Sequence, residues 1–214
     1  MQIDHFHFYV EDAQKWRDWF VQVMGFQAIA GGSHQHTHTE VVSSGSVTFV
    51  LSSPLTELSP VAQFLRWHPP GVADLAFAVA DLELVMARAQ AFGAKVRQPI
   101  QQRQFAQGQL KWSQIVGEAD LNHTLIERTG VTPVLPFDWL VEKPAAGKQE
   151  DRFIGIDHVV LNVAVGDLER TVSWYEKALG FVRKQTSVDH KLISEEKSLW
   201  VKLLERGGLS SGDR

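Results

Sequence analysis

The sequence predicts an α+β fold built from tandem βαβββ modules, and an internal repeat is the main reason. An alternating segment, 3–10, precedes an amphipathic stretch that ends at Gly25. The same pattern returns at 156–163 and ends at Gly180. Two alternating side-chain faces are typical of a strand, and apolar residues at helical spacing before a glycine indicate a helix and its end. Each copy therefore opens with a strand followed by a helix.

The residues between these two copies complete the modules. Asp12 can cap the first helix, and short β-rich runs at 40–42 and 47–51 flank a Ser-Gly turn, which predicts a hairpin. A third partial copy begins at 71–79, with Asp81 as the cap of its helix. Two further β-like segments, around 112–116 and 123–128, follow that helix.

These elements predict four parts along the chain. We expect a complete N-terminal domain at 1–131, a linker at 132–153, the start of a second domain at 154–186, and a divergent, flexible tail at 187–214. The linker contains three prolines and has no sustained periodicity, and the tail ends in a Gly- and Ser-rich run.

Composition narrows the classes of function. A net charge of −4 without a long basic run argues against nucleic acid as a partner. The chain has no cysteine, so any metal must be held by His, Asp or Glu. No apolar run approaches the ~20 residues of a membrane span, and no basic leader precedes the first strand. We expect a cytoplasmic protein without a membrane partner, and self-association into a homo-oligomer stays open.

The module pattern and several short motifs resemble a known family. The strand 156–163, the segments 174–177 (WYEK) and 179–181 (LGF), and the segment 68–72 (HPPGV) are similar to 4-hydroxyphenylpyruvate dioxygenases, which belong to the vicinal oxygen chelate (glyoxalase/dihydroxybiphenyl dioxygenase-like) superfamily. The resemblance covers about residues 1–185. It implies a non-haem Fe(II) enzyme that oxidises an aromatic 2-oxo acid with O2 to homogentisate, in tyrosine catabolism or quinone biosynthesis.

The resemblance also implies that His158 is the first iron ligand. Judged by its residue type alone, a strand histidine is more often a core residue satisfied by hydrogen bonds. In the first domain Asp74 occupies the position of the second ligand, and the same spacing counted from His158 runs past Arg214. We therefore expect a truncated catalytic domain without its later ligands, and a chain that is inactive by itself.

A second candidate site is a triad by position in the first domain, formed by His5, Asp74 and Glu127. If the strands pair as expected, all three side chains point into the cleft. In the resembling family this domain is structural, which implies a vestigial, hydrogen-bonded site instead of a metal centre.

Three alternating histidines, His34, His36 and His38, are a third candidate, because in an extended segment they would share one face and could bind zinc or nickel. Their Gly, Ser and Thr neighbours favour a solvated loop or strand edge. Two alternatives to the main reading of function stay open. One is a 4-hydroxymandelate synthase-like enzyme, and the other is a metal-free small-molecule-binding module of the same superfamily.

Overall fold

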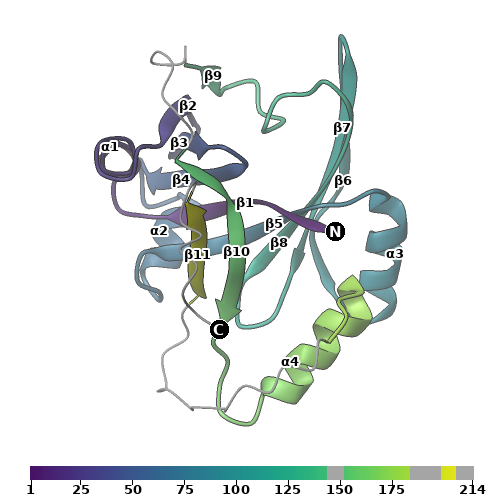
Figure 1. The fold of residues 1–214 in the computed structure, drawn as a ribbon. Helices are drawn as coiled ribbons and strands as arrows, with labels where there is room; N and C mark the ends of the chain where they lie inside the picture. The colour runs from purple at the N-terminus through teal and green to yellow at the C-terminus, as the bar shows by residue number, and fades with distance from the viewer. Residues whose placement is uncertain (144–151, 184–198, 206–214) are drawn as a thin grey trace, which may run out of the picture. The chain divides into compact units, whose positions relative to one another are not determined.

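The computed structural model describes residues 1–143, 152–183 and 199–205 (Figure 1). Contacts between residues divide the chain into two compact units. The first unit comprises residues 3–75, 135–160 and 200–214, and the second unit comprises residues 1–2, 76–134 and 161–199. None of the described helices has the length and apolar character needed to cross a lipid bilayer.

The first unit is built on a mixed sheet. Its strands, in spatial order, are β5 (Gly71–Ala78), β1 (Gln2–Tyr9), β4 (Val47–Pro54), β3 (Thr37–Ser44), β2 (Gln27–His34) and β9 (Val141–Glu142). β1 and β4 run parallel, whereas β4, β3, β2 and β9 pair antiparallel in turn. The opening strand, the hairpin and the strand at 71–79 are confirmed, and they account for β1, β3, β4 and β5.

β2 was not predicted, because Gly31 and Gly32 interrupt its sequence pattern. A side chain at Gly32 would collide with the carbonyl oxygen of Trp139, so this glycine lets the segment 135–143 pass close to the strand. The buried cluster next to this segment consists of Val41, Val50 and Leu135. The predicted linker is therefore partly packed onto the sheet, although the domain boundaries themselves stay a prediction.

α1 (Ala13–Gln22) covers one face of this sheet. It begins at Asp12, whose carboxylate accepts hydrogen bonds from the backbone N–H groups of Gln14 and Lys15, both at 3.1 Å. Rings from the helix and the strands pack together beneath it. These rings are Phe6, Phe8, Phe20, Phe26 and Phe49. Because a fully buried phenylalanine contributes about 1.5–3 kcal/mol, this cluster holds α1 in place. Trp19 and Val23, two of the apolar residues at helical spacing before Gly25, are nevertheless exposed.

The second unit contains an antiparallel sheet of β6 (Lys95–Phe105), β7 (Gly108–Val116) and β8 (Asn122–Gly130), together with α3 (Leu82–Ala91). The helix begins at the predicted cap, where Asp81 accepts a hydrogen bond from the Leu84 N–H at 2.8 Å. β7 and β8 correspond to the two expected β-like segments. β6 was missed because it is an edge strand whose residues are mostly polar and exposed, so it has no apolar alternation.

The helix of the last repeat belongs to the second unit. α4 (Leu168–Trp174) continues into one π-helical turn, η1 (Tyr175–Leu179), and Gly180 ends it with a positive φ of 76°. Arg88 of α3 donates a hydrogen bond to the Lys177 carbonyl at 2.9 Å. The Tyr175 hydroxyl lies 2.9 Å from His123 Nε2 on β8. These contacts seat the helix against both α3 and β8.

The strand of the last repeat, β10 (Phe153–Leu161), pairs with β11 (Leu199–Glu205) in a two-stranded sheet. Phe153 is buried against Phe26, and its N–H and that of Arg152 donate hydrogen bonds to the Ser44 hydroxyl. β11 lies inside the stretch 187–214 that was expected to be a flexible tail. The other residues of that stretch lie outside the described part of the chain.

Glu40 of β3 is a buried carboxylate with three basic partners. Its side chain is 3% exposed, and Oε1 accepts hydrogen bonds from Arg17 Nη1 at 2.9 Å and His38 Nε2 at 3.0 Å. Its Oε2 pairs with Lys143 Nζ. A buried carboxylate is costly unless it is paired. These contacts join α1, β3 and the residue that follows β9.

Replacing Glu40 with glutamine should lower the free energy of unfolding by about 3 kcal/mol, because Arg17 and Lys143 lose their buried counter-charge. Urea denaturation followed by circular dichroism measures the change. Glu57→Gln is the matched control, since Glu57 pairs with Arg66 but is 84% exposed. Its effect should stay within about 0.5 kcal/mol. Equal losses in the two variants would contradict the role given to Glu40.

Candidate functional site

Two copies of the repeat place a carboxylate beside the histidine of their first strand. In β1, His5 Nδ1 lies 2.7 Å from Asp4 Oδ1, and in β10, His158 Nδ1 lies 3.0 Å from Asp157 Oδ2. A carboxylate on Nδ1 fixes the tautomer of the ring and leaves Nε2 as a ligand atom, which is how metal-binding histidines are oriented. The dipeptide Asp-His is the sequence signal for this pairing, and its role was overlooked.

The two histidines differ in exposure. His5 is buried, whereas 53% of the His158 side chain is exposed. An exposed imidazole can be approached by a metal ion and by ligands from other segments. Of the two, His158 is therefore the histidine that is available for binding in this structure.

His7 extends the polar face of β1 into a buried chain of hydrogen bonds. Its Nε2 lies 2.7 Å from Ser52 Oγ, and Ser52 Oγ lies 2.7 Å from Thr39 Oγ1. Burial lowers the pKa of His7 to about 4, while the Asp74 carboxylate opposes this shift and His5 adds to it. His7 is consequently neutral at pH 7. No sequence motif marks this chain, because its members lie on three different strands.

The three residues of the positional triad, His5, Asp74 and Glu127, lie in different surroundings. Asp74 is buried on β5, close enough to His7 to act on its charge. Glu127 belongs to the second unit, where Oε2 accepts a hydrogen bond from the Leu82 N–H at 2.7 Å and Oε1 lies 3.2 Å from Lys111 Nζ. Glu127 therefore lies at the start of α3, where the Leu82 N–H and Lys111 engage its carboxylate. Alternation along a strand shows which residues share a face, but not which face a helix covers.

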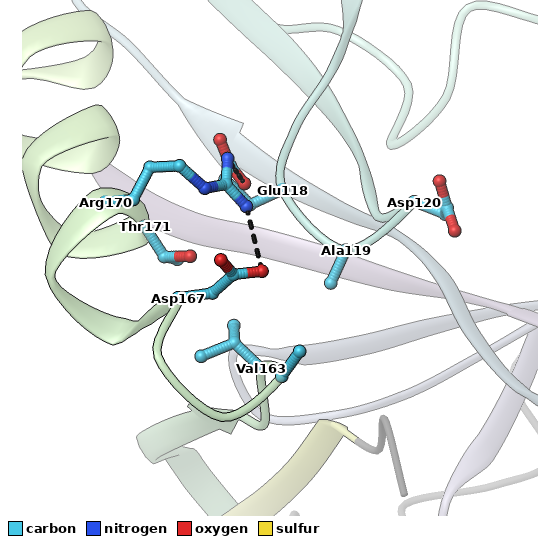
Figure 2. Close-up of a pocket in the computed structure, with 8 residues that line it drawn as sticks. Glu118, Ala119, Asp120, Val163, Asp167, Arg170 and Thr171 are labelled. Atoms are coloured by element: carbon cyan, nitrogen blue, oxygen red, sulfur yellow. Dashed lines mark hydrogen bonds and ion pairs between the residues drawn. The ribbon is translucent and has the colours of Figure 1, made fainter. Parts of the chain in front are cut away.

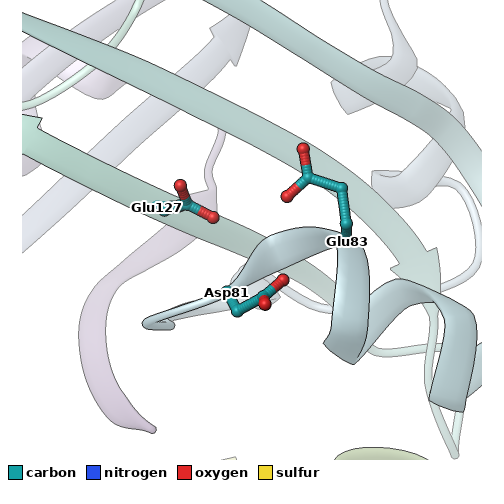
Figure 3. A group of neighbouring side chains, drawn as sticks. All are labelled: Asp81, Glu83 and Glu127. Atoms are coloured by element: carbon teal, nitrogen blue, oxygen red, sulfur yellow. The ribbon is translucent and has the colours of Figure 1, made fainter.

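Within the described residues, one group of three acidic or imidazole side chains brings its ligand atoms within 4.8 Å of one another: Asp81, Glu83 and Glu127 (Figure 3). Lys111 Nζ lies 2.9 Å from Glu83 and 3.2 Å from Glu127. Hydrogen bonding to Lys111 lowers the pKa of Glu83, and the two glutamates raise the pKa of Lys111. The lysine already supplies the positive charge, so the group anchors the start of α3.

The three alternating histidines do not share one face. They flank the tight turn between β2 and β3, where Gln35 has a positive φ of 51°. The partners are the Trp139 ring for His34, the Thr56 hydroxyl for His36 and the Glu40 carboxylate for His38. The extended row of imidazoles required for a shared zinc or nickel site is therefore absent from this hairpin.

Comparison with known proteins assigns most of this chain to one family. A family model described as Glyoxalase/Bleomycin resistance protein/Dioxygenase superfamily matches residues 2–124 and 155–208. The matched residues include both modules of the first 130 residues and the last copy of the repeat. The match thus extends over most of the chain.

Two curated relatives are fungal 4-hydroxyphenylpyruvate dioxygenases. The protein from Coccidioides posadasii is 33% identical over 218 residues, which cover 90% of this chain and 53% of that protein. The protein from Aspergillus fumigatus is 32% identical over 221 residues, which cover 91% of this chain and 54% of that protein. The chain spans about half the length of the curated relatives it matches.

A solved structure supports the same grouping. A mutant of 4-hydroxymandelate synthase from Streptomyces coelicolor superposes with a TM-score of 0.72 at 29% sequence identity. The superposition covers 84% of this chain and 52% of that chain. The α+β fold of βαβββ modules is therefore confirmed by fold comparison as well as by the strand order.

The lowered pKa of His7 should make stability depend on pH. The folded value of about 4 lies below the ordinary value of 6.5, so the folded state binds fewer protons than the unfolded state. Stability should be full above pH 6.5 and fall as the pH drops towards 4. The loss attributable to His7 should reach at most about 3 kcal/mol.

The variant His7→Gln tests this dependence, because glutamine does not titrate but can still bond to Ser52. Urea unfolding measured across the same pH window should show a weaker dependence in the variant than in the parent chain. His158→Gln is the control, since it removes an exposed histidine and should retain the parent slope. An unchanged slope in His7→Gln would refute the assignment.

Proposed function

Because the chain belongs to the glyoxalase/bleomycin resistance protein/dioxygenase superfamily, we propose that it forms part of a 4-hydroxyphenylpyruvate dioxygenase-like enzyme. The proposed reaction is the Fe(II)-dependent oxidation of an aromatic 2-oxo acid by O2, with homogentisate as the product. This reaction would serve tyrosine catabolism or quinone biosynthesis in the cytoplasm. The identity to two such dioxygenases over about half of their length supports the proposal.

The observation that carries the proposal is the Asp157–His158 pair on β10. A non-haem Fe(II) site of this class uses two histidines and one carboxylate. His158 can offer Nε2, while Asp157 holds Nδ1 at 3.0 Å and thereby sets the direction of the ring. When bound, the iron would supply open coordination positions for the 2-oxo acid and O2. The exposure of His158 allows the remaining ligands to approach it.

We propose that these 214 residues alone do not catalyse the reaction. A single imidazole cannot fix the geometry of an oxygen-reactive iron. Among the residues that the structure describes, no group of three ligand atoms within 4.8 Å includes His158. The other two ligands of the iron would then come from sequence that corresponds to the unmatched half of the relatives.

His5, Asp74 and Glu127 are proposed as a vestigial counterpart of the iron site. His5 keeps the Asp-His pairing of its copy, but it is buried. Glu127 is engaged by Leu82 and Lys111. Hydrogen bonds and an ion pair therefore satisfy groups that a metal would otherwise need to hold.

A second candidate reaction is 4-hydroxymandelate synthesis, which the superposition on 4-hydroxymandelate synthase favours. It uses the same iron and substrate but hydroxylates the side chain in place of the ring. A metal-free binding module of the same superfamily is a third candidate, and it would bind a small molecule without releasing CO2. Product analysis separates the first two, and iron dependence separates both from the third.

The 214-residue chain, supplied with Fe(II), ascorbate and 4-hydroxyphenylpyruvate, should give only background oxygen uptake in an electrode. A chimera that joins residues 1–183 to the remaining catalytic half of the Coccidioides posadasii relative should consume O2 and form homogentisate. In that chimera His158→Ala should abolish turnover. Asp157→Asn should weaken iron binding by about 10- to 100-fold, because the ring loses its orienting carboxylate.

Asp4→Asn in the same chimera is the matched control, since it breaks the equivalent pair in the buried copy and should leave iron binding unchanged. Turnover that survives His158→Ala would overturn the proposed ligand. Hydroxymandelate as the product would favour the second candidate reaction. Iron-independent binding of the oxo acid without CO2 release would favour the binding module.

A further inference from the structure

The turn between β3 and β4 holds the start of β10. The Ser44 hydroxyl accepts hydrogen bonds from the backbone N–H groups of Arg152 at 3.1 Å and Phe153 at 3.2 Å. The Ser46 hydroxyl donates a hydrogen bond to the carbonyl oxygen of Ile154 at 2.7 Å. Three consecutive backbone residues are thus bonded to two serines of the first module.

Gly45 makes this close approach possible. Its φ of 57° lies in the left-handed region, and a Cβ atom at this position would lie 2.1 Å from the Phe153 carbonyl oxygen. Any side chain here would push the two backbone segments apart. A hairpin turn explains the positive φ of this glycine, but it does not explain why the space beside the glycine is filled. The turn 44–46 therefore serves the later strand as well as its own hairpin.

The side chain of Phe153 determines which face of β10 is covered. Phe153 is 2% exposed, and its ring centroid lies 5.4 Å from that of Phe26, which is fully buried. Side chains alternate between two faces along a strand, so residues separated by an odd number of positions lie on opposite faces. His158 comes five positions after Phe153 and therefore lies on the face turned away from Phe26. Its exposure of 53% agrees with this placement.

A slip of β10 by one residue would reverse this arrangement. Ile154, which is 52% exposed, would take the place of Phe153, and His158 would move to the covered face. The bonds to the two serines and the seat of the Phe153 ring oppose such a slip, because they engage particular residues of the strand.

The segment that follows β10 has an anchor of its own in the second unit. Arg170 of α4 lies 3.3 Å from Asp167, as the dashed line in Figure 2 marks, and both residues line a pocket of that unit. Asp167 comes nine positions after His158, whereas Ile154 comes four positions before it. The turn 44–46 is therefore the nearer anchor, and it is bonded to the strand itself.

We propose that the turn 44–46 fixes the register of β10 and thereby decides the face on which His158 offers Nε2 to the iron. The two serines of the turn and Phe153 are then positioning residues, and the glycine allows the close approach. This role rests on the proposed function, because it concerns the histidine proposed as the iron ligand. The first module thus has a task in the iron site besides its own folding.

NMR spectroscopy of the full 214-residue chain, without iron, tests both parts of the proposal. Overhauser contacts between the Phe153 and Phe26 rings mark the register of the structure, whereas contacts of the Ile154 methyl groups with Phe26 mark a slipped strand. The ring nitrogen shifts of His158 show which nitrogen of the neutral imidazole carries the proton. The parent chain should show the first set of contacts and a proton on Nδ1, beside Asp157.

Gly45→Ala should weaken the contacts between the Phe153 and Phe26 rings, because the added Cβ atom displaces the start of β10. The ratio of the two His158 tautomers should shift at least about threefold towards the form protonated on Nε2, since the contact with Asp157 is loosened. Gly93→Ala is the matched control. Gly93 also has a positive φ, of 83°, but a Cβ atom there would meet nothing within 4 Å, so both readouts should stay unchanged.

Ser46→Ala is a milder variant that covers the case in which Gly45→Ala does not fold. It should change both readouts in the same direction, and Ser46→Thr should restore the parent spectrum because it keeps the hydroxyl. Arg170→Gln breaks the anchor that follows the strand and should leave both readouts unchanged.

Parent-like His158 signals in folded Gly45→Ala and Ser46→Ala chains, or equal changes in Gly45→Ala and Gly93→Ala, would overturn the proposal. A turn that only supports folding would alter the contacts between the Phe153 and Phe26 rings and leave the His158 ring unchanged, which also contradicts the proposal. Because the chain is measured without iron, a chimera that fails to bind iron would refute the proposed ligand and leave the assignment of the register standing.

Discussion

In each βαβββ module the helix that follows the first strand covers one face of the strands beside it, and in the first module a short second helix, α2 (Pro60–Leu65), follows β4. In β1 the covered face carries Phe6 and Phe8, which pack beneath α1. The opposite face carries the polar side chains of His5 and His7, which need hydrogen-bond partners where they are buried. Asp4 and Ser52 meet that need. The polar face of β1 therefore arises from the same alternation that builds the hydrophobic core.

Two acidic groups among the described residues are balanced by bases of the same chain. Lys143 and Arg17 neutralise Glu40, and Lys111 lies between Glu83 and Glu127. An acidic group that holds its own lysine has no need of a metal ion, however close its oxygens lie. Charge balance thus identifies the groups around Glu40 and around Asp81, Glu83 and Glu127 as structural.

The sequence allowed the repeat, the caps and most strands of the first 130 residues to be predicted, because these depend on local alternation and on residues such as Asp12 and Asp81. β2 and β6 were not predicted, because glycines in β2 and exposed polar residues in β6 remove that alternation. The role of His158 as an iron ligand stays a prediction, and the Asp-His dipeptide signals its contact with Asp157, whose length of 3.0 Å the structure supplies. The position of Glu127 at the start of α3 depends on a contact between distant segments. No local pattern encodes it.

The position of β6 has a consequence for the behaviour of the chain in concentrated solution. An edge strand has unpaired backbone N–H and C=O groups to which another chain can pair. Long edge strands are therefore frequent starting points of aggregation. β6 is eleven residues long, yet its pairing with β7 shifts register twice, between Val96 and Gln98 and across Pro99, and Lys95 and Arg97 are exposed. Proline cannot donate to a ladder, and like charges repel a second copy. The polar and charged residues of β6, which prevented its prediction from apolar alternation, thus also protect the strand against assembly into fibrils.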